Sequence, residues 1–63
     1  SCKGMGSRMM RSIMDVARDK GLREIIGLVL TNNSNMLKLM RSLGFSVKPY
    51  PDDPDFRLVT YQL

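Results

Sequence analysis

The sequence predicts an α/β (α+β) fold, with two helices and three strands that belong to an incomplete mixed sheet. Three observations support this prediction. Two segments repeat apolar residues at helical spacing, a short apolar run lies between them, and the last stretch alternates apolar with polar residues. Glycine follows each helical segment, and a turn rich in proline and aspartate precedes the last stretch. The expected order is therefore loop, helix, strand, helix, strand, strand.

The first expected element is a loop at residues 3–8 that leads into a helix from Ser7 to Lys20. Ser7 is a suitable N-cap, and Gly21 stands where helices commonly end in the left-handed conformation. Apolar residues of this helix recur at spacings of three and four, on one broad face: Met9, Met10, Ile13, Met14, Val16 and Ala17. Because methionine fills irregular gaps well, we expect this face to form core rather than a cofactor site.

The middle of the chain predicts a strand followed by a second helix. Residues 25–30 form a short, almost continuous apolar run, which is typical of a strand buried on both faces inside a sheet. Gly27 within this run indicates a bulge or a close approach of the backbone. A polar break then precedes a helix from Asn35 to Leu43, which Gly44 ends.

The last third of the chain predicts an antiparallel hairpin. Residues 45–47 and 56–63 alternate in the manner of strands, and the segment between them contains three prolines and three aspartates. Proline cannot donate a ladder hydrogen bond and aspartate favours turns, so this segment is expected to form the connecting loop.

Composition limits the chemistry that is available. The 63 residues include one cysteine, Cys2, and no histidine, so neither an internal disulfide nor a His/Cys metal site is expected. A single thiol and six methionines suit a reducing compartment, and we expect a cytoplasmic location. No apolar run approaches the roughly 20 residues that span a bilayer, so no membrane partner is expected. The net charge of +4 is compatible with an anionic partner.

Gly4 and Gly6 stand one residue apart, just before the first helical pattern. A helix N-terminus presents unpaired backbone N–H groups and a partial positive charge, which suit a phosphate. Glycine lets an anion approach the backbone closely, and Lys3, Arg8 and Arg11 add positive charge nearby. The glycine pair alone is a weak signal, and an ordinary junction between loop and helix is the alternative interpretation.

Three stretches, in this order and spacing, resemble the C-terminal half of a GNAT-type N-acetyltransferase. Residues 3–7, Lys-Gly-Met-Gly-Ser, are similar to that family's acetyl-CoA pyrophosphate loop, Arg/Gln-x-x-Gly-x-Gly/Ala. The second stretch is the helix and strand that follow this loop, separated by Gly21. The third is Asn33, the apolar helix after it and the closing Leu-Gly-Phe at residues 43–45. The resemblance covers residues 3–45, and the terminal hairpin also fits.

The short motifs Lys-Gly-x-Gly, Met-Leu and Leu-Gly-Phe look most like those of the acetyltransferase domain fused to bacterial acyl-CoA-synthetase-like proteins, which act on protein lysines. The resemblance implies acetyl-CoA as cosubstrate and transfer of its acetyl group to an amine, with a protein lysine as one candidate acceptor. It also implies that residues 1–63 form a partial GNAT domain whose first half is missing. The chain alone is then expected to be inactive.

The resemblance assigns residues to the CoA thioester as well. The expected pyrophosphate-binding residues are Lys3, Gly4, Met5, Gly6, Ser7 and Arg8. Asn33, at the end of the central strand, is expected to hydrogen-bond the cofactor or the substrate backbone. An alternative role for Asn33 is to cap the second helix.

Two positions depart from the family pattern. Ser1 stands where the pyrophosphate motif begins with Arg or Gln. Met40 stands where many members carry a tyrosine that protonates the departing CoA thiolate, and methionine cannot donate a proton. No residue is a convincing base, because Asp15 and Glu24 fall on exposed positions, and Cys2 has no histidine to activate it. The catalytic residues are therefore left unassigned.

Three other functions share part of this pattern. A non-catalytic acyl-CoA-sensing module has the same binding site without turnover. A basic nucleic-acid-binding helix has the required arginines, but aspartates interrupt its basic face and aromatic residues are few, so nucleic acid is not expected as a partner. A dinucleotide-binding unit needs a third glycine where Met9 stands.

The strand at residues 25–30 has an open side if the first half of the domain is absent. An unpaired apolar edge is a template for association with another strand. We therefore expect either a homodimer or pairing with the missing half of the domain.

Overall fold

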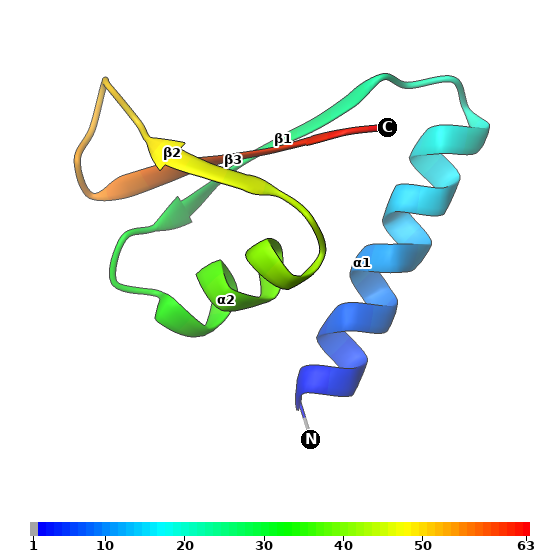
Figure 1. Cartoon of the computed structure of the whole chain (residues 1–63), viewed down its shortest axis with the longest axis horizontal. Helices are drawn as coiled ribbons and strands as arrows, with labels where there is room; N and C mark the ends of the chain where they lie inside the picture. The colour runs from blue at the N-terminus through cyan, green and yellow to red at the C-terminus, as the bar shows by residue number, and fades with distance from the viewer. Residues whose placement is uncertain (1) are drawn as a thin grey trace.

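The computed structural model describes the backbone of residues 2–63 and the side chains of residues 6–63. Five elements follow one another in the expected order, which confirms the predicted α/β class. They are α1 (Cys2–Asp19), β1 (Glu24–Leu30), α2 (Ser34–Ser42), β2 (Ser46–Pro49) and β3 (Phe56–Gln62). In Figure 1 the sheet is seen edge-on, with both helices on the same side of it.

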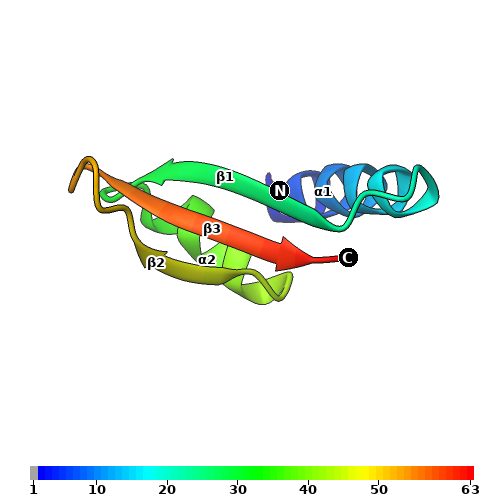
Figure 2. The same cartoon turned by 90° about the horizontal axis from the view of Figure 1, so that it is seen from above.

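The three described strands form an antiparallel sheet in the order β1-β3-β2. β2 and β3 form the expected hairpin. β1 pairs with β3 without interruption, from Glu24 opposite Gln62 to Leu30 opposite Phe56. The unbroken register means that no bulge forms at Gly27. Figure 2 shows that β1 lies at one edge of this sheet and not inside it.

The prediction that residues 25–30 are buried on both faces is wrong. Val29 points towards the helices and is 9% exposed, whereas Ile26 and Leu28 point to the opposite face and are 61% and 47% exposed. Successive side chains of a strand point to opposite faces, and α1 and α2 cover only one face of this sheet. The apolar run therefore has one buried side and one side in solvent.

Both helices end at the glycines that the sequence singles out. Gly21 has a φ of 78° and Gly44 a φ of 96°, as expected for left-handed residues at helix ends. After α1, the amide of Leu22 donates to the carbonyl of Ala17 at 3.0 Å. The amide of Phe45 makes the equivalent bond at the end of α2. These bonds satisfy carbonyls of the last turn and direct the chain back to the sheet.

The core lies between the sheet and the two helices. Its buried members come from both helices, from β1 and β3 and from the connection between α2 and β2: Met14, Val29, Leu37, Met40, Phe45 and Val59. The expected apolar face of α1 is only partly in this core. Met10 and Met14 pack there, whereas Met9 is 62% exposed. Ile13 and Val16 are also exposed, at about half of their surface. A sheet three strands wide is too narrow to cover the whole apolar arc of the helix.

Candidate functional site

The segment expected to form a phosphate-binding loop is helical. α1 begins at Cys2 instead of Ser7, so residues 3–8 lie in its first two turns and Ser7 is not an N-cap. The reason is local. In a helix each backbone group finds a partner four residues away, and these bonds offset the roughly 1 kcal/mol by which each glycine disfavours the helix.

Helical geometry divides the backbone amides of this segment into two groups. The first four N–H groups of a helix have no acceptor within it, so the amides of Lys3 and Gly4 are directed out of the N-terminal end of α1. The amides of Gly6, Ser7 and Arg8 have acceptors four residues earlier in the helix. The second group reaches an anion only when the start of α1 unwinds.

The side chains near this end contribute positive charge and a helix contact. A Cβ atom built on Gly6 lies 3.4 Å from Cδ2 of Leu39 in α2, so residue 6 lies at the contact between the helices. Arg8 and Arg11 are exposed. The side chains of residues 3–5 lie outside the described residues. The outward amides and the Arg8 guanidinium are groups that can donate hydrogen bonds to an anion.

Asn33 caps α2. Its side-chain oxygen accepts a hydrogen bond from the amide of Met36 at 3.1 Å, which is the alternative role considered for this residue. The cap does not use the side-chain NH2 group, which can donate to a ligand. Figure 1 shows that the N-terminal end of α2 lies farther from α1 than its C-terminal end does. Asn33 and residues 3–8 therefore lie apart, and the structure does not bring them into one cluster.

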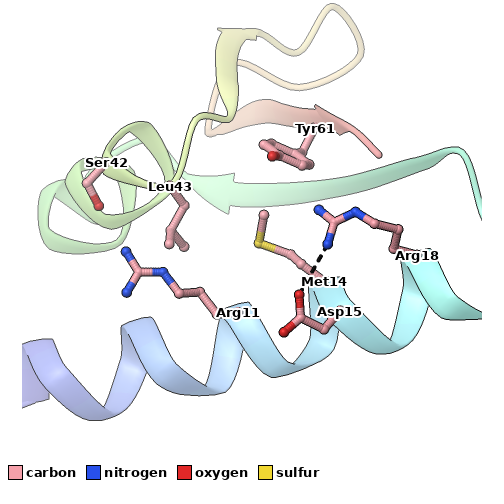
Figure 3. Close-up of a pocket in the computed structure, with 7 residues that line it drawn as sticks. All are labelled: Arg11, Met14, Asp15, Arg18, Ser42, Leu43 and Tyr61. Atoms are coloured by element: carbon pink, nitrogen blue, oxygen red, sulfur yellow. Dashed lines mark hydrogen bonds and ion pairs between the residues drawn. The ribbon is translucent and has the colours of Figure 1, made fainter.

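A groove that the sequence did not single out lies between α1, the end of α2 and β3 (Figure 3). It has a volume of about 260 Å³ and is lined by Arg11, Met14, Asp15, Arg18, Ser42, Leu43 and Tyr61. Arg18 donates to Asp15 at 3.1 Å, which offsets part of the positive charge. The signal in the sequence is the spacing 11, 14, 15 and 18, which places four side chains on one stripe of α1.

The structure places each of the three residues that were considered for an acid–base role in a structural or surface position. Met40, at the position of the expected tyrosine, is 6% exposed and packs in the core. Glu24 accepts a hydrogen bond from Gln62, and Asp15 pairs with Arg18. Both acids are exposed. These contacts agree with the expectation that the two acids are surface charges.

Among residues 6–63, no three His, Cys, Asp or Glu side chains gather where they could hold a metal ion. Neither α1 nor α2, as described from Cys2 onward, combines the length and the apolar character needed to cross a membrane.

The chain is similar to a known protein family over most of its length. A family model described as the acetyltransferase (GNAT) family matches residues 2–45. The matched range contains α1, β1 and α2, and therefore both glycines at the start of α1 and Asn33. No solved structure matches the chain.

Proposed function

Because the chain belongs to the acetyltransferase (GNAT) family, we propose that it is the acetyl-CoA-binding half of an N-acetyltransferase, which transfers an acetyl group from acetyl-CoA to an amine. The observation that carries this proposal is the position of the family match, which begins at the glycine-containing start of α1. CoA contains a diphosphate, and the N-terminal end of a helix favours such an anion through its amides and its dipole. Arg8 adds exposed charge near the same end.

The proposed diphosphate site requires a change in α1. Gly6, Ser7 and Arg8 donate their amides within the helix, so their use by a ligand requires residues 2–6 to leave it. Gly4 and Gly6 make this stretch easy to unwind, because each disfavours a helix by about 0.8–1.0 kcal/mol relative to alanine. After unwinding, Ser7 occupies the N-cap position for which its hydroxyl is suited. We propose that CoA binding shortens α1 in this way.

Asn33 has a proposed second role beside its cap. The side-chain oxygen stays bonded to the amide of Met36, and the NH2 group donates to the cofactor or to the substrate backbone. The two roles use different atoms, so one does not exclude the other.

We propose that the acid–base groups of the reaction belong to the other half of the domain. Transfer needs an amine held against the thioester carbonyl and a base that removes its proton. Asp15 pairs with Arg18 and Glu24 accepts from Gln62, so neither is free to serve as this base, and we propose that residues 1–63 are a partial domain that is inactive alone. By likeness to the domain fused to bacterial acyl-CoA-synthetase-like proteins, we propose a protein lysine as acceptor. A cytoplasmic location accords with the single thiol.

Amide hydrogen exchange tests the diphosphate site. The chain is studied with the polypeptide that completes the domain supplied in trans, and CoA is the probe. We expect CoA to slow exchange of the amides of residues 4–8. Pantetheine, which lacks the diphosphate, is the control ligand and should leave these amides unchanged. Equal exchange with and without CoA contradicts the assignment of the site.

The alternative function is a non-catalytic module that senses acyl-CoA. Both functions predict the same amide protection, so turnover must separate them. The completed domain is incubated with acetyl-CoA and a lysine-containing peptide, and free CoA thiol is followed with a thiol-reactive dye. Release of thiol together with a gain of one acetyl group on the peptide supports the acetyltransferase. Tight binding without either change supports the sensing module.

A further inference from the structure

The groove between α1, the end of α2 and β3 has no part in the proposed transfer reaction. Its volume of about 260 Å³ lies just below the roughly 300–1,000 Å³ typical of ligand pockets, so it can hold only a small molecule. α1 contributes two arginines and an aspartate, Ser42 and Tyr61 contribute hydroxyls, and Met14 and Leu43 contribute apolar side chains (Figure 3). Such a lining can contact both a charged part and an apolar part of one ligand.

The groove lies on the flank of α1 that faces the rest of the described chain. Arg11, Asp15 and Arg18 line it together with residues of α2 and β3. At about 100° per residue, Ile13 and Val16 lie on the opposite flank of the helix. Figure 2 shows α1 on the β1 side of the molecule and α2 on the β2 side. A polypeptide that extends the sheet at the edge of β1 therefore meets the other flank of α1 and leaves the groove open.

The guanidinium group of Arg11 is available to a ligand. Arg11 is exposed, and no carboxylate of residues 6–63 lies within ion-pair distance of it. The end of α2 does not need it as a capping donor, because the carbonyls of the last turn accept bonds from backbone amides. Arg11 therefore brings a full positive charge and its N–H donors to the groove, and nothing in the described chain neutralises that charge.

The other polar groups of the groove also favour an anion. Arg18 donates to Asp15 at 3.1 Å, so the two arginines and one aspartate leave one positive charge in excess. The hydroxyl of Ser42 donates to the carbonyl of Leu39 at 2.7 Å and can only accept from a ligand. The hydroxyl of Tyr61 makes no hydrogen bond with the described residues, so it can donate.

We propose that this groove binds a small organic anion, in which one carboxylate or phosphate group lies beside a short apolar portion. Arg11 holds the anionic group with its planar fork of donors, and Arg18 and Tyr61 add further donors. Figure 3 shows the guanidinium groups of Arg11 and Arg18 on opposite sides of Met14. The apolar portion of the ligand then packs against Met14 and Leu43, which removes it from water.

An NMR titration of the isotope-labelled chain tests the proposal, with the polypeptide that completes the domain supplied in trans. The probes are pentanoate and butyl phosphate, which each join an anionic group to a short alkyl chain. We expect at least one of them to cause saturating shifts of the amides of Ser42, Leu43 and Tyr61. The tighter probe identifies the anionic group as carboxylate or phosphate. No probe contains CoA, so the result does not depend on the proposed function.

Two further ligands separate the charge from the apolar portion. Pentan-1-ol has the alkyl chain without the charge and should cause no saturating shift. Acetate has the charge without the chain and should bind at least about tenfold more weakly than pentanoate, because it buries less apolar surface. A groove that binds pentan-1-ol as tightly as the anions, or acetate as tightly as pentanoate, overturns the proposal.

Arg11→Gln should weaken binding of the tighter probe by about tenfold or more, because it removes the charged donor of the anionic group. Arg41→Gln is the matched control, since it removes the same charge from an exposed position in the last turn of α2, outside the groove. The control should bind the probe as tightly as the original protein. Both positions are exposed, so circular dichroism should show a retained fold in both variants.

Asp15→Asn should have the opposite effect and strengthen binding severalfold, because it removes a negative charge and releases the donors of Arg18. Asp19→Asn removes the same charge from an exposed position of α1 outside the groove and should change the affinity little. The proposal is overturned by the absence of saturating shifts with both anions, by full affinity in Arg11→Gln, or by an Asp15 variant that binds no more tightly than the Asp19 variant.

Discussion

A Cβ atom placed on Gly6 lies 3.4 Å from Cδ2 of Leu39, so residue 6 is at once a helical position and a contact between α1 and α2. That distance leaves room for one methyl group but little for a branched side chain. The glycine costs the helix stability, and its presence there has no packing reason that alanine could not meet. The proposed unwinding of α1 supplies a reason, because it needs a weak helix start.

Gly6→Ala should therefore raise stability and lower affinity for CoA. We expect the free energy of unfolding to rise by about 0.5–1 kcal/mol, because alanine is the better helix former and its methyl group fits beside Leu39. A firmer helix start opposes unwinding, so CoA should bind more weakly to the completed domain. Chemical denaturation and a CoA titration measure the two effects.

Ser12→Ala is the matched control for Gly6→Ala. Ser12 is exposed in the middle of α1, beyond the segment proposed to unwind. Its replacement also favours the helix, but it should leave CoA affinity unchanged. If the Gly6 variant gains stability and still binds CoA as tightly as the original protein, α1 does not need to unwind.

Much of the fold could be predicted because its signals are local. The left-handed conformations of Gly21 and Gly44 depend on the residue type and on the helix just before it, and both are as expected. The hairpin of β2 and β3 likewise follows from alternation around a turn of prolines and aspartates. The exposure of Ile26 could not be predicted, because it depends on whether a second layer covers that face of the sheet.

The candidate site shows the same division. Gly4 and Gly6 predict a place where a ligand approaches the backbone. The sequence does not decide whether this segment is a loop or a helix, because the two states differ in free energy by only a few hydrogen bonds and two glycine penalties. The groove beside Arg11 and Arg18 joins α1 to the ends of α2 and β3, so its lining depends on tertiary packing. The cap formed by Asn33 could be predicted because capping is local, whereas its contact with a ligand stays a prediction.

Two substitutions of Asn33 separate its cap from its proposed contact with a ligand. Asn33→Ala removes the acceptor for the amide of Met36 and should lower the free energy of unfolding by about 1 kcal/mol. Asn33→Asp keeps the acceptor and should keep most of that stability, but it loses the NH2 donor. If the NH2 group contacts CoA or substrate, the aspartate variant binds more weakly in the completed domain. Thermal denaturation and titration give both values, and full affinity in the aspartate variant limits Asn33 to capping.

The two left-handed glycines should differ in their tolerance of alanine. Gly21 has no other atom within 4 Å of a Cβ built on it, so Gly21→Ala carries only the roughly 1–2 kcal/mol of a left-handed conformation. A Cβ on Gly44 lies 3.1 Å from Cε1 of Tyr61, a ring that also packs against Phe45. Gly44→Ala should therefore cost more than Gly21→Ala. Denaturant midpoints compare the variants, and equal losses show that the Tyr61 ring moves aside freely.

Replacement by alanine should cost much more stability at Met14 than at Met9, although both belong to the same helix. Met14 is 6% exposed in the core, so Met14→Ala should cost about 2–5 kcal/mol. At roughly 0.05–0.15 kcal/mol per residue the whole chain has only about 3–9 kcal/mol of stability, so much of the protein should then unfold. Met9 is 62% exposed, so Met9→Ala should leave the unfolding of dilute monomer almost unchanged. Chemical denaturation compares the two variants, and a loss of stability at Met9 as large as that at Met14 contradicts the difference in their burial.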